Sequence, residues 1–308
     1  MTFTAPASAF EHLALFYDGD DAYVKGVASF LQAGGDGVAL VAVPRGHIDL
    51  LRGTPYSVPG QVSFVDMTDL GANPSCIIPA IRSFVDGHRG SPVRFVGEPT
   101  WPGRSDPESA EATRHEALIN LAFGQSNAQI LCPYDAGGLP GPVLADAERT
   151  HPHLVDGEQR VASTGYRDPL EFTDPANWPL DPAPQAAAPP VQFDGLVEPR
   201  RRVRAQAADA GLEPDRLAAL LLAVNEICTN TLQHGPGPGT LRMWATDNGV
   251  VCEVHDAGAI ADPLAGRHVK RAAADRGRGM FLAHHLCDLV EVRSSPAAGT
   301  TVRLHVHR

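Results

Sequence analysis

The chain has 308 residues, 43% of them hydrophobic and 20% charged, which is typical of a globular protein with two domains. It has no apolar run long enough to span a membrane and no signal peptide pattern, so we expect a cytoplasmic protein without membrane contact. Residues 1–190 hold 11 basic against 23 acidic residues, a balance of −12 that disfavours direct binding to nucleic acid. The five cysteines are scattered without a Cys-x-x-Cys pair, which predicts reduced thiols rather than a disulfide framework or a zinc site.

The first half alternates apolar, strand-like runs with segments of helical spacing. We expect strands at 13–17, 38–43, 62–65, 93–96 and 130–132, and helices at 22–31, 47–51, 76–85 and 108–122. Such alternation predicts an α/β domain with a doubly wound, mainly parallel sheet that is covered on both faces.

A proline-rich segment, residues 168–190, separates this half from the rest. Its seven prolines favour extended backbone over packing, which predicts a semi-rigid linker between a domain at 1–167 and a domain at 191–308. The alternative is a long surface loop bound to one of the two domains.

The second half begins with a helix at 197–212 and a longer helix at 214–234, which Gly235 is expected to end as a C′ glycine. Asn248-Gly249 predicts a hairpin between strands at 241–245 and 250–254. A helix at 279–287 and strands at 289–292 and 301–306 follow. This order predicts a two-layer α/β sandwich with an antiparallel-rich sheet.

Four short motifs follow one another within about 75 residues of the second half. They are Asn225-Glu226-Ile-Cys-Thr-Asn230-Thr-Leu-Gln-His234-Gly235, Asp256-Ala257-Gly258, Arg276-Gly277-Arg278-Gly279-Met280 and Gly299-Thr300-Thr301. Each is weak alone, but in this order they resemble the N, G1 and G2 boxes and the final strand of the GHKL (HATPase_c) ATPases. That family has the Bergerat fold, and the closest resemblance is to the anti-sigma factor serine/threonine kinases.

The resemblance implies that this domain binds ATP with Mg²⁺. It implies Glu226 as the catalytic base, Asn230 as a Mg²⁺ ligand and Asp256 as the acceptor of the adenine amino group. Other cofactor-binding residues that it implies are Gly258, Arg276, Gly277, Arg278, Gly279, Met280 and Thr300. Residues 261–275 would form a lid in which Arg267, Lys270 and Arg271 grip phosphate, or else a solvated loop.

The first half resembles the MEDS domain, a sensory module named from methanogen and methylotroph regulators. The resemblance covers residues 11–156 and rests on His12-Leu-Ala-Leu-Phe-Tyr17, Gly97-Glu98-Pro-Thr-Trp101, Arg114-His-Glu116 with Asn120, Cys132-Pro-Tyr134-Asp135 and His151-Pro152. It implies a RecA-like fold. No Gly-x-x-x-x-Gly-Lys motif follows the first strand, so we expect no P-loop nucleotide site.

The residues that we single out in the first half are Glu98, Trp101, Glu116, Tyr134 and Asp135, several of which end predicted strands where open α/β sheets bind ligands. For Cys132 we favour a buried strand residue over a redox sensor. The spacings of His151 with His153 and of His305 with His307 suit metal ligands, but neither pair has a cysteine or carboxylate partner in view, so no metal site is predicted there.

Together these features predict a signalling regulator in which a sensory domain with an unknown ligand controls an anti-sigma serine/threonine kinase. Its partners would be an anti-anti-sigma (STAS-type) protein, a sigma factor or both, and a homodimer is compatible with the resemblance. One alternative is a non-catalytic, ATP-dependent protein-binding switch. Another is an atypical sensor histidine kinase that uses His115, which precedes Glu116. The basic run Arg200–Arg204 is either a solvated face or a docking surface for an acidic partner.

Overall fold

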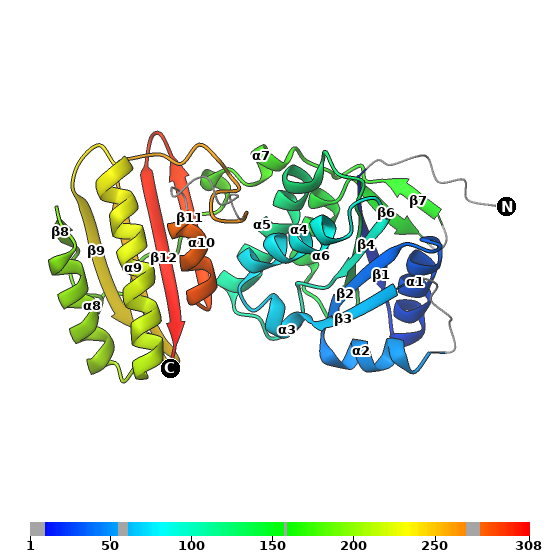
Figure 1. The fold of residues 1–308 in the computed structure, drawn as a ribbon, viewed down its shortest axis with the longest axis horizontal. Helices are drawn as coiled ribbons and strands as arrows, with labels where there is room; N and C mark the ends of the chain where they lie inside the picture. The colour runs from blue at the N-terminus through cyan, green and yellow to red at the C-terminus, as the bar shows by residue number, and fades with distance from the viewer. Residues whose placement is uncertain (1–9, 55–60, 157–158, 269–277) are drawn as a thin grey trace. The chain divides into compact units, whose positions relative to one another are not determined.

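The computed structural model describes residues 10–54, 61–156, 159–268 and 278–308 (Figure 1). The chain divides into two compact units, Met1–Thr173 and Asp174–Arg308, and each unit contains a sheet of its own. Within the described residues, no helix is both long enough and apolar enough to cross a membrane.

The first unit is built on a seven-stranded sheet with the order β3-β2-β4-β5-β1-β6-β7. Its strands are β1 (Glu11–Tyr17), β2 (Val38–Val43), β3 (Gln61–Asp66), β4 (Val93–Gly97), β5 (Gln129–Asp135), β6 (His153–Asp156) and β7 (Gln159–Ala162). Strands β1 to β6 run parallel, and β7 pairs antiparallel with β6. Every residue of β2 and β4 is buried, as expected for parallel strands that are covered on both faces.

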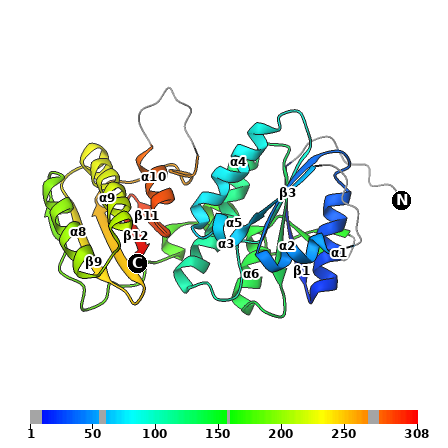
Figure 2. The same cartoon turned by 60° about the horizontal axis from the view of Figure 1, so that its bottom comes forward.

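Helices connect these strands in two directions across the sheet. They are α1 (Asp20–Gln32), α2 (Arg45–Arg52), α3 (Met67–Leu70), α4 (Ile77–Gly87), α5 (Asp106–Phe123), α6 (Gly141–Thr150) and α7 (Pro169–Phe172). The chain moves from β1 through β2 to β3 and then returns through β4 to β5. Right-handed crossovers in opposite directions place helices on opposite faces, and α1 lies on one side of the strands with α4 and α5 on the other (Figure 2). The predicted doubly wound sheet is therefore confirmed.

The second unit is a five-stranded antiparallel sheet with three helices on one face. The strands, in the order β11-β12-β10-β9-β8, are β8 (Val191–Phe193), β9 (Gly239–Ala245), β10 (Gly249–Asp256), β11 (Leu289–Ser295) and β12 (Gly299–His307). The helices are α8 (Val197–Asp209), α9 (Pro214–His234) and α10 (Gly279–Leu286). Val203, Leu220, Val224 and Ala283 from these helices share one core with strand residues such as Leu304. This is the predicted two-layer sandwich.

The other face of this sheet is polar and contacts part of residues 174–190, a segment that we call the strap. Arg303 reaches the strap through Nη2, which donates to the Asp181 carbonyl over 2.6 Å. The Arg293 guanidinium donates to the Trp178 carbonyl. Residues 174–190 also group with the second unit, whereas α7 contacts α5 and α6 of the first. The sequence left two interpretations of this segment, a semi-rigid linker and a surface loop bound to one domain. The contacts of the strap with the second unit fit the surface loop better.

Candidate functional site

A cavity of about 300 Å³ opens in the second unit between α9, the end of β10, the loop that follows it and α10. This volume lies at the lower end of the range for small-molecule sites. Among the predicted residues, Asn230, Asp256, Gly258, Met280 and Thr300 line it. The lining also includes residues that the motifs did not single out for a role, namely Ile227, Thr231, His234, Gly235, Ala259, Ile260, Ala261, Asp262, Ala265, Gly266, His268 and Val302.

Asp256 is the last residue of β10 and is held in place through both of its carboxylate oxygens. Its Oδ2 accepts a hydrogen bond of 2.8 Å from the hydroxyl of Thr231, which is 2% exposed. Its Oδ1 accepts a hydrogen bond of 2.7 Å from the Gly258 N–H. Each carboxylate oxygen has a second lone pair, so Asp256 can still accept a hydrogen bond from a molecule in the cavity.

Two glycines keep this wall of the cavity free of side chains. A Cβ on Gly258 would lie 2.8 Å from Asp256 Oδ1 and 3.3 Å from the Cα of Gly235. Gly235 follows the last residue of α9 with φ of −72°, so it is not the left-handed C′ glycine that the sequence suggested. Glycine is needed there for space instead, because a Cβ would lie 2.6 Å from the Thr231 carbonyl oxygen.

Thr300 and Ser294 fix the loop that follows Asp256. The Thr300 hydroxyl donates to the Gly258 carbonyl over 2.9 Å and lies 2.7 Å from Ser294 Oγ. Because the Thr300 hydroxyl proton is directed to the Gly258 carbonyl, the Ser294 hydroxyl must donate the hydrogen bond to Thr300 Oγ1. Ser294 Oγ in turn accepts from the Ile260 N–H over 2.7 Å. Sequence analysis missed Ser294, since it lies on β11, outside all four motifs.

Glu226 and Asn230 lie one turn apart on α9, and both face the first residue of α10. A Cβ on Gly279 would lie 2.8 Å from Glu226 Oε2 and 3.4 Å from Asn230 Nδ2. The first turn of a helix offers backbone N–H groups without helical partners and suits negatively charged groups. The fold therefore brings together a carboxylate, an amide and a helix N-terminus beside the cavity.

The remaining predicted residues are distributed as follows. Arg278 is the exposed N-cap residue of α10, and Met280 is 7% exposed in the cavity wall. Arg267 is only 5% exposed, which does not support a role as a phosphate grip. Arg276, Gly277, Lys270 and Arg271 lie outside the described residues.

These features suit a nucleotide. The cavity offers a hydrogen-bond acceptor at Asp256, a glycine wall that a flat ring can approach, and the side-chain amide of Asn230 close to a helix N-terminus. Oxygen ligands are those that Mg²⁺ prefers, and it binds phosphates together with few protein groups.

In the first unit, Glu98 follows β4 and forms a buried hydrogen-bonded group at the carboxyl edge of the parallel strands. Its Oε2 lies 2.7 Å from His47 Nδ1, and its Oε1 accepts from the Tyr17 hydroxyl over 3.1 Å. Burial raises the pKa of Glu98. Burial also acts to lower the pKa of His47, but the hydrogen bond and charge of Glu98 raise it overall. Both shifts favour a proton held between the two side chains, at the edge where such sheets bind ligands.

The other residues singled out in the first unit have structural partners. Arg104 stacks its guanidinium 3.7 Å from the Trp101 ring centroid. Asp135 accepts hydrogen bonds of 3.0 Å from the N–H groups of Gly137 and Gly138. Tyr134 is 3% exposed, and Cys132 is a buried strand residue as expected.

The fold and the sites define a protein with a doubly wound α/β unit and an α/β-sandwich unit whose cavity suits a nucleotide. Residues 11–152 match the sequence model of MEDS, the methanogen/methylotroph, DcmR sensory domain. Residues 190–306 match that of the histidine kinase-like ATPase domain. The chain is a fusion of a MEDS domain with a GHKL-type ATPase domain, which confirms both resemblances and gives it the architecture of a signalling regulator.

Proposed function

We propose that the second unit is an anti-sigma factor type of serine/threonine kinase that uses Mg-ATP and is controlled by the MEDS domain. The observation that carries this proposal is the position of Glu226 and Asn230 together against Gly279, at the N-terminus of α10 and beside the cavity of Asp256. A site that only binds nucleotide has less need of a carboxylate at this point.

In this proposal, Asp256 accepts a hydrogen bond from the adenine amino group, while Thr231 and the Gly258 N–H keep its carboxylate oriented. Gly258 lets the base lie flat against the wall. Asn230 contributes its amide oxygen to Mg²⁺, and Met280 and Thr300 shape and hold the cavity. Arg278 and Gly279, at the start of α10, would contact the phosphates, and Arg276 and Gly277 lie outside the described residues.

Glu226 would orient the hydroxyl of the acceptor protein and remove its proton as the hydroxyl oxygen bonds to the γ-phosphorus and the bond from that phosphorus to the departing ADP breaks. When bound, ATP would supply the phosphoryl group, and Mg²⁺ would offset the negative charge of the phosphates. Positioning carries most of the catalysis in phosphoryl transfer, so the packing of Gly279 against Glu226 matters for rate. The acceptor would be a serine or threonine of an anti-anti-sigma (STAS-type) protein, and sequestration of a sigma factor would be the regulated output.

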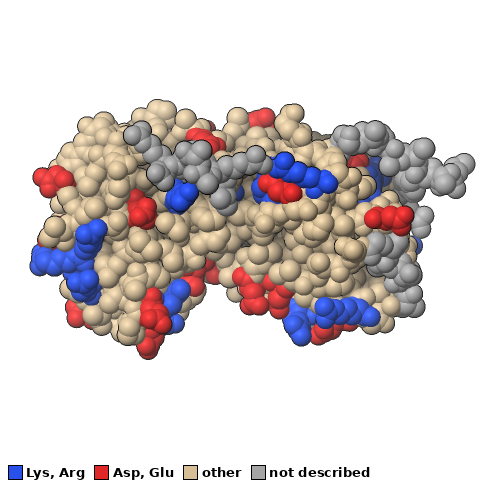
Figure 3. Space-filling view, in the orientation of Figure 1, with Lys and Arg blue, Asp and Glu red and all other residues tan. Residues whose placement is uncertain are grey.

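A second candidate is a switch in which ATP occupancy changes partner binding without phosphotransfer. Its support is the basic surface of α8, where exposed Arg200, Arg201 and Arg204 gather (Figure 3). Arg201 forms an ion pair of 2.7 Å with Glu198, and Arg200 Nε donates a hydrogen bond of 2.9 Å to Asn225 Oδ1. Two of these arginines therefore already have partners within the second unit.

The histidine kinase alternative is disfavoured by burial. His115, the candidate phosphate acceptor, is 0% exposed on α5 of the MEDS domain. A phosphorylated histidine must be reachable by the ATPase site. In the second unit the helix directly before α9 is α8, a single helix of 13 residues, where histidine kinases carry a helix hairpin.

The test is incubation of the full chain with γ-labelled ATP and small STAS-type proteins from the source cell. Transfer of label to a serine or threonine of one such protein, lost in the Glu226→Ala variant, supports the kinase. ATP-dependent binding without label transfer supports the switch. Acid-labile label on the chain itself would point to the histidine kinase.

A further inference from the structure

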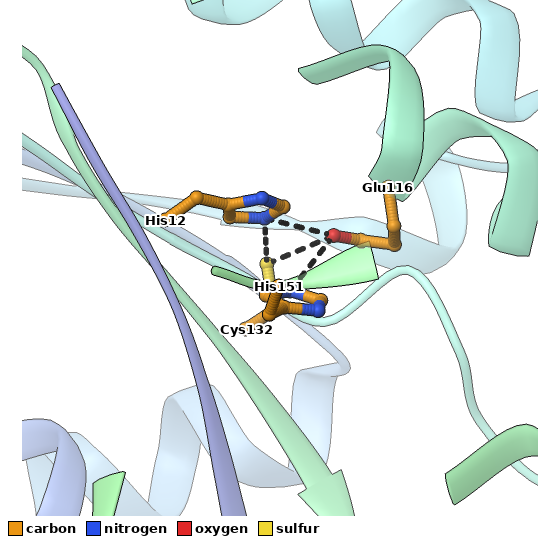
Figure 4. A group of neighbouring side chains, drawn as sticks. All are labelled: His12, Glu116, Cys132 and His151. Carbon is orange, nitrogen blue, oxygen red and sulfur yellow. Dashed lines mark hydrogen bonds and ion pairs between the residues drawn. The ribbon is translucent and has the colours of Figure 1, made fainter. Parts of the chain in front are cut away.

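Four polar side chains from distant parts of the chain meet in the core of the MEDS domain. They are His12 on β1, Glu116 on α5, Cys132 on β5 and His151, which directly follows α6 (Figure 4). Their exposed fractions are 0%, 1%, 1% and 0%. His12 and Cys132 are 120 positions apart in the sequence, and only the parallel pairing of β1 with β5 brings them together.

The four candidate ligand atoms converge on one point. Glu116 Oε2 lies 3.1 Å from His12 Nε2, 3.2 Å from His151 Nε2 and 3.2 Å from Cys132 Sγ. Cys132 Sγ lies 3.5 Å from His12 Nε2, and all four atoms lie within 4.8 Å of one another. In a tetrahedral zinc site, bonds of about 2.0–2.3 Å place neighbouring ligand atoms roughly 3.3–3.6 Å apart. The four measured separations are close to this range, and the ligand atoms need only a small shift at His151 to complete the tetrahedron.

Both histidines are oriented by a hydrogen bond on their other ring nitrogen. His151 Nδ1 lies 2.8 Å from the Ala147 carbonyl oxygen, which can only accept. His12 Nδ1 lies 3.1 Å from Asn120 Oδ1. Asn120 is fixed in this orientation because its Nδ2 donates to the Thr150 carbonyl over 2.8 Å.

Each Nδ1 therefore carries the proton, and each Nε2 directs a lone pair into the cluster. This is the arrangement that the outer hydrogen bonds of metal-binding histidines produce. Without a cation, these lone pairs would face the Glu116 carboxylate. The second oxygen of Glu116, Oε1, has no hydrogen-bond partner within the described residues, although it is buried. An uncompensated carboxylate in a protein core is costly.

We propose that His12, Glu116, Cys132 and His151 form a closed, four-coordinate Zn²⁺ site that holds the MEDS domain together. Two neutral imidazoles, one thiolate and one carboxylate balance the charge of one divalent cation, which makes the buried site neutral. Sulfur and imidazole ligands favour zinc over Mg²⁺ or Ca²⁺. Four protein ligands leave no open position, which is typical of structural sites rather than catalytic ones.

The site would join β1, α5, β5 and the segment between α6 and β6. It reverses the sequence-based expectation of no zinc site, which was drawn from the absence of paired cysteines. It is independent of the nucleotide site, because all four ligands lie in the first unit.

The test is the metal content of the full chain, purified from zinc-supplemented cells and dialysed against a weak chelator. We expect about one zinc per chain, and less than a tenth of that in Cys132→Ala and His151→Ala. His153→Ala, which removes a neighbouring histidine outside the cluster, should keep the full content. Asn120→Ala should keep the ligands but weaken zinc binding by about 10–100-fold, since it removes the support of His12.

If the ligand variants fail to fold, cobalt substitution of the unaltered chain still decides the matter. A tetrahedral Co²⁺ spectrum with a thiolate charge-transfer band is expected. A metal-free chain that takes up neither ion overturns the proposal. So would stoichiometric iron in place of zinc, or His153→Ala losing as much metal as His151→Ala.

Discussion

Thr231 on α9 donates its hydroxyl to Asp256 Oδ2 over 2.8 Å, and so joins the helix of the first GHKL motif to the strand end of the second. This bond fixes the carboxylate that we assign to adenine. It also brings the two motifs together in one site, although Thr231 and Asp256 are 25 positions apart in the sequence.

Asp256→Asn should weaken ATP binding by about 10–150-fold, because a hydrogen bond to a charged acceptor is worth about 1.5–3 kcal/mol. Thr231→Val should reduce the binding free energy of ATP by less, about 0.5–1.5 kcal/mol, since it removes only the hydrogen bond that orients Asp256. Calorimetric titration with ATP measures both. Unchanged affinity in Asp256→Asn would place the adenine elsewhere.

Glu226→Ala should keep ATP affinity within a few-fold and lower phosphotransfer by about 10² or more, the usual contribution of a positioned base. Gln233→Ala, an exposed change on the same helix, is the matched control and should leave both unchanged. Transfer at the normal rate in Glu226→Ala would remove this residue from the mechanism.

Gly279→Ala should lower the rate of phosphotransfer strongly. It should change the melting temperature only slightly. Its Cβ would lie 2.8 Å from Glu226 Oε2, so the carboxylate must move, and small displacements of a catalytic group are costly. Gly46→Ala, where a Cβ meets no atom within 4 Å, is the control for a glycine change in a helix. The rate of labelling of the acceptor and the melting temperature separate the two effects. Equal losses of rate in both variants would contradict the prediction.

Glu98 and His47 should contribute stability to the MEDS domain that is lost as the pH rises. Both pKa values are raised above their ordinary values of 4.5 and 6.5, so the folded state binds protons that the unfolded chain releases. This stabilisation is fully present at pH values below the pKa values of the unfolded chain. It is lost as the pH rises through the pKa values of the folded protein. In urea unfolding at a series of pH values, the free energy that separates the unaltered chain from Glu98→Gln should shift in favour of Glu98→Gln as the pH rises above 4.5. Asp36→Asn, an exposed change, should follow the unaltered chain. Parallel curves for Glu98→Gln and the unaltered chain would refute the assignment.

A fragment of residues 174–308 should be more stable than one of residues 191–308, because only the longer fragment keeps the strap. Arg293 and Arg303 would lose the carbonyl oxygens of Trp178 and Asp181, and a hydrogen bond to a charged group is worth about 1.5–3 kcal/mol. At roughly 4–8 °C per kcal/mol, the shorter fragment should melt at least about 6 °C lower. Both should bind ATP. Equal melting temperatures would mean that the strap is only a tether.

The elements that the sequence located best are those with strong local patterns. The helix at 214–234 has the predicted bounds, because Pro214 and Asp215 suit its first turn and its apolar residues form one buried stripe. The strand at 38–43 also has its predicted bounds. The hairpin of β6 and β7 and the short strand β8 were missed, since each has only three or four residues and none is an apolar run that is buried throughout.

The sequence by itself determined the two domain families and the order of the nucleotide-binding motifs. Those signals lie within single helices, turns and strand ends, whose geometry depends on neighbouring residues. Only the tertiary structure decided that Ser294 supports the Asp256 loop, that Arg267 is buried, and that Glu116 meets two histidines and a cysteine. Those partners lie 16 to 104 positions from Glu116, and the pairing of parallel strands, rather than any local spacing, places them in contact.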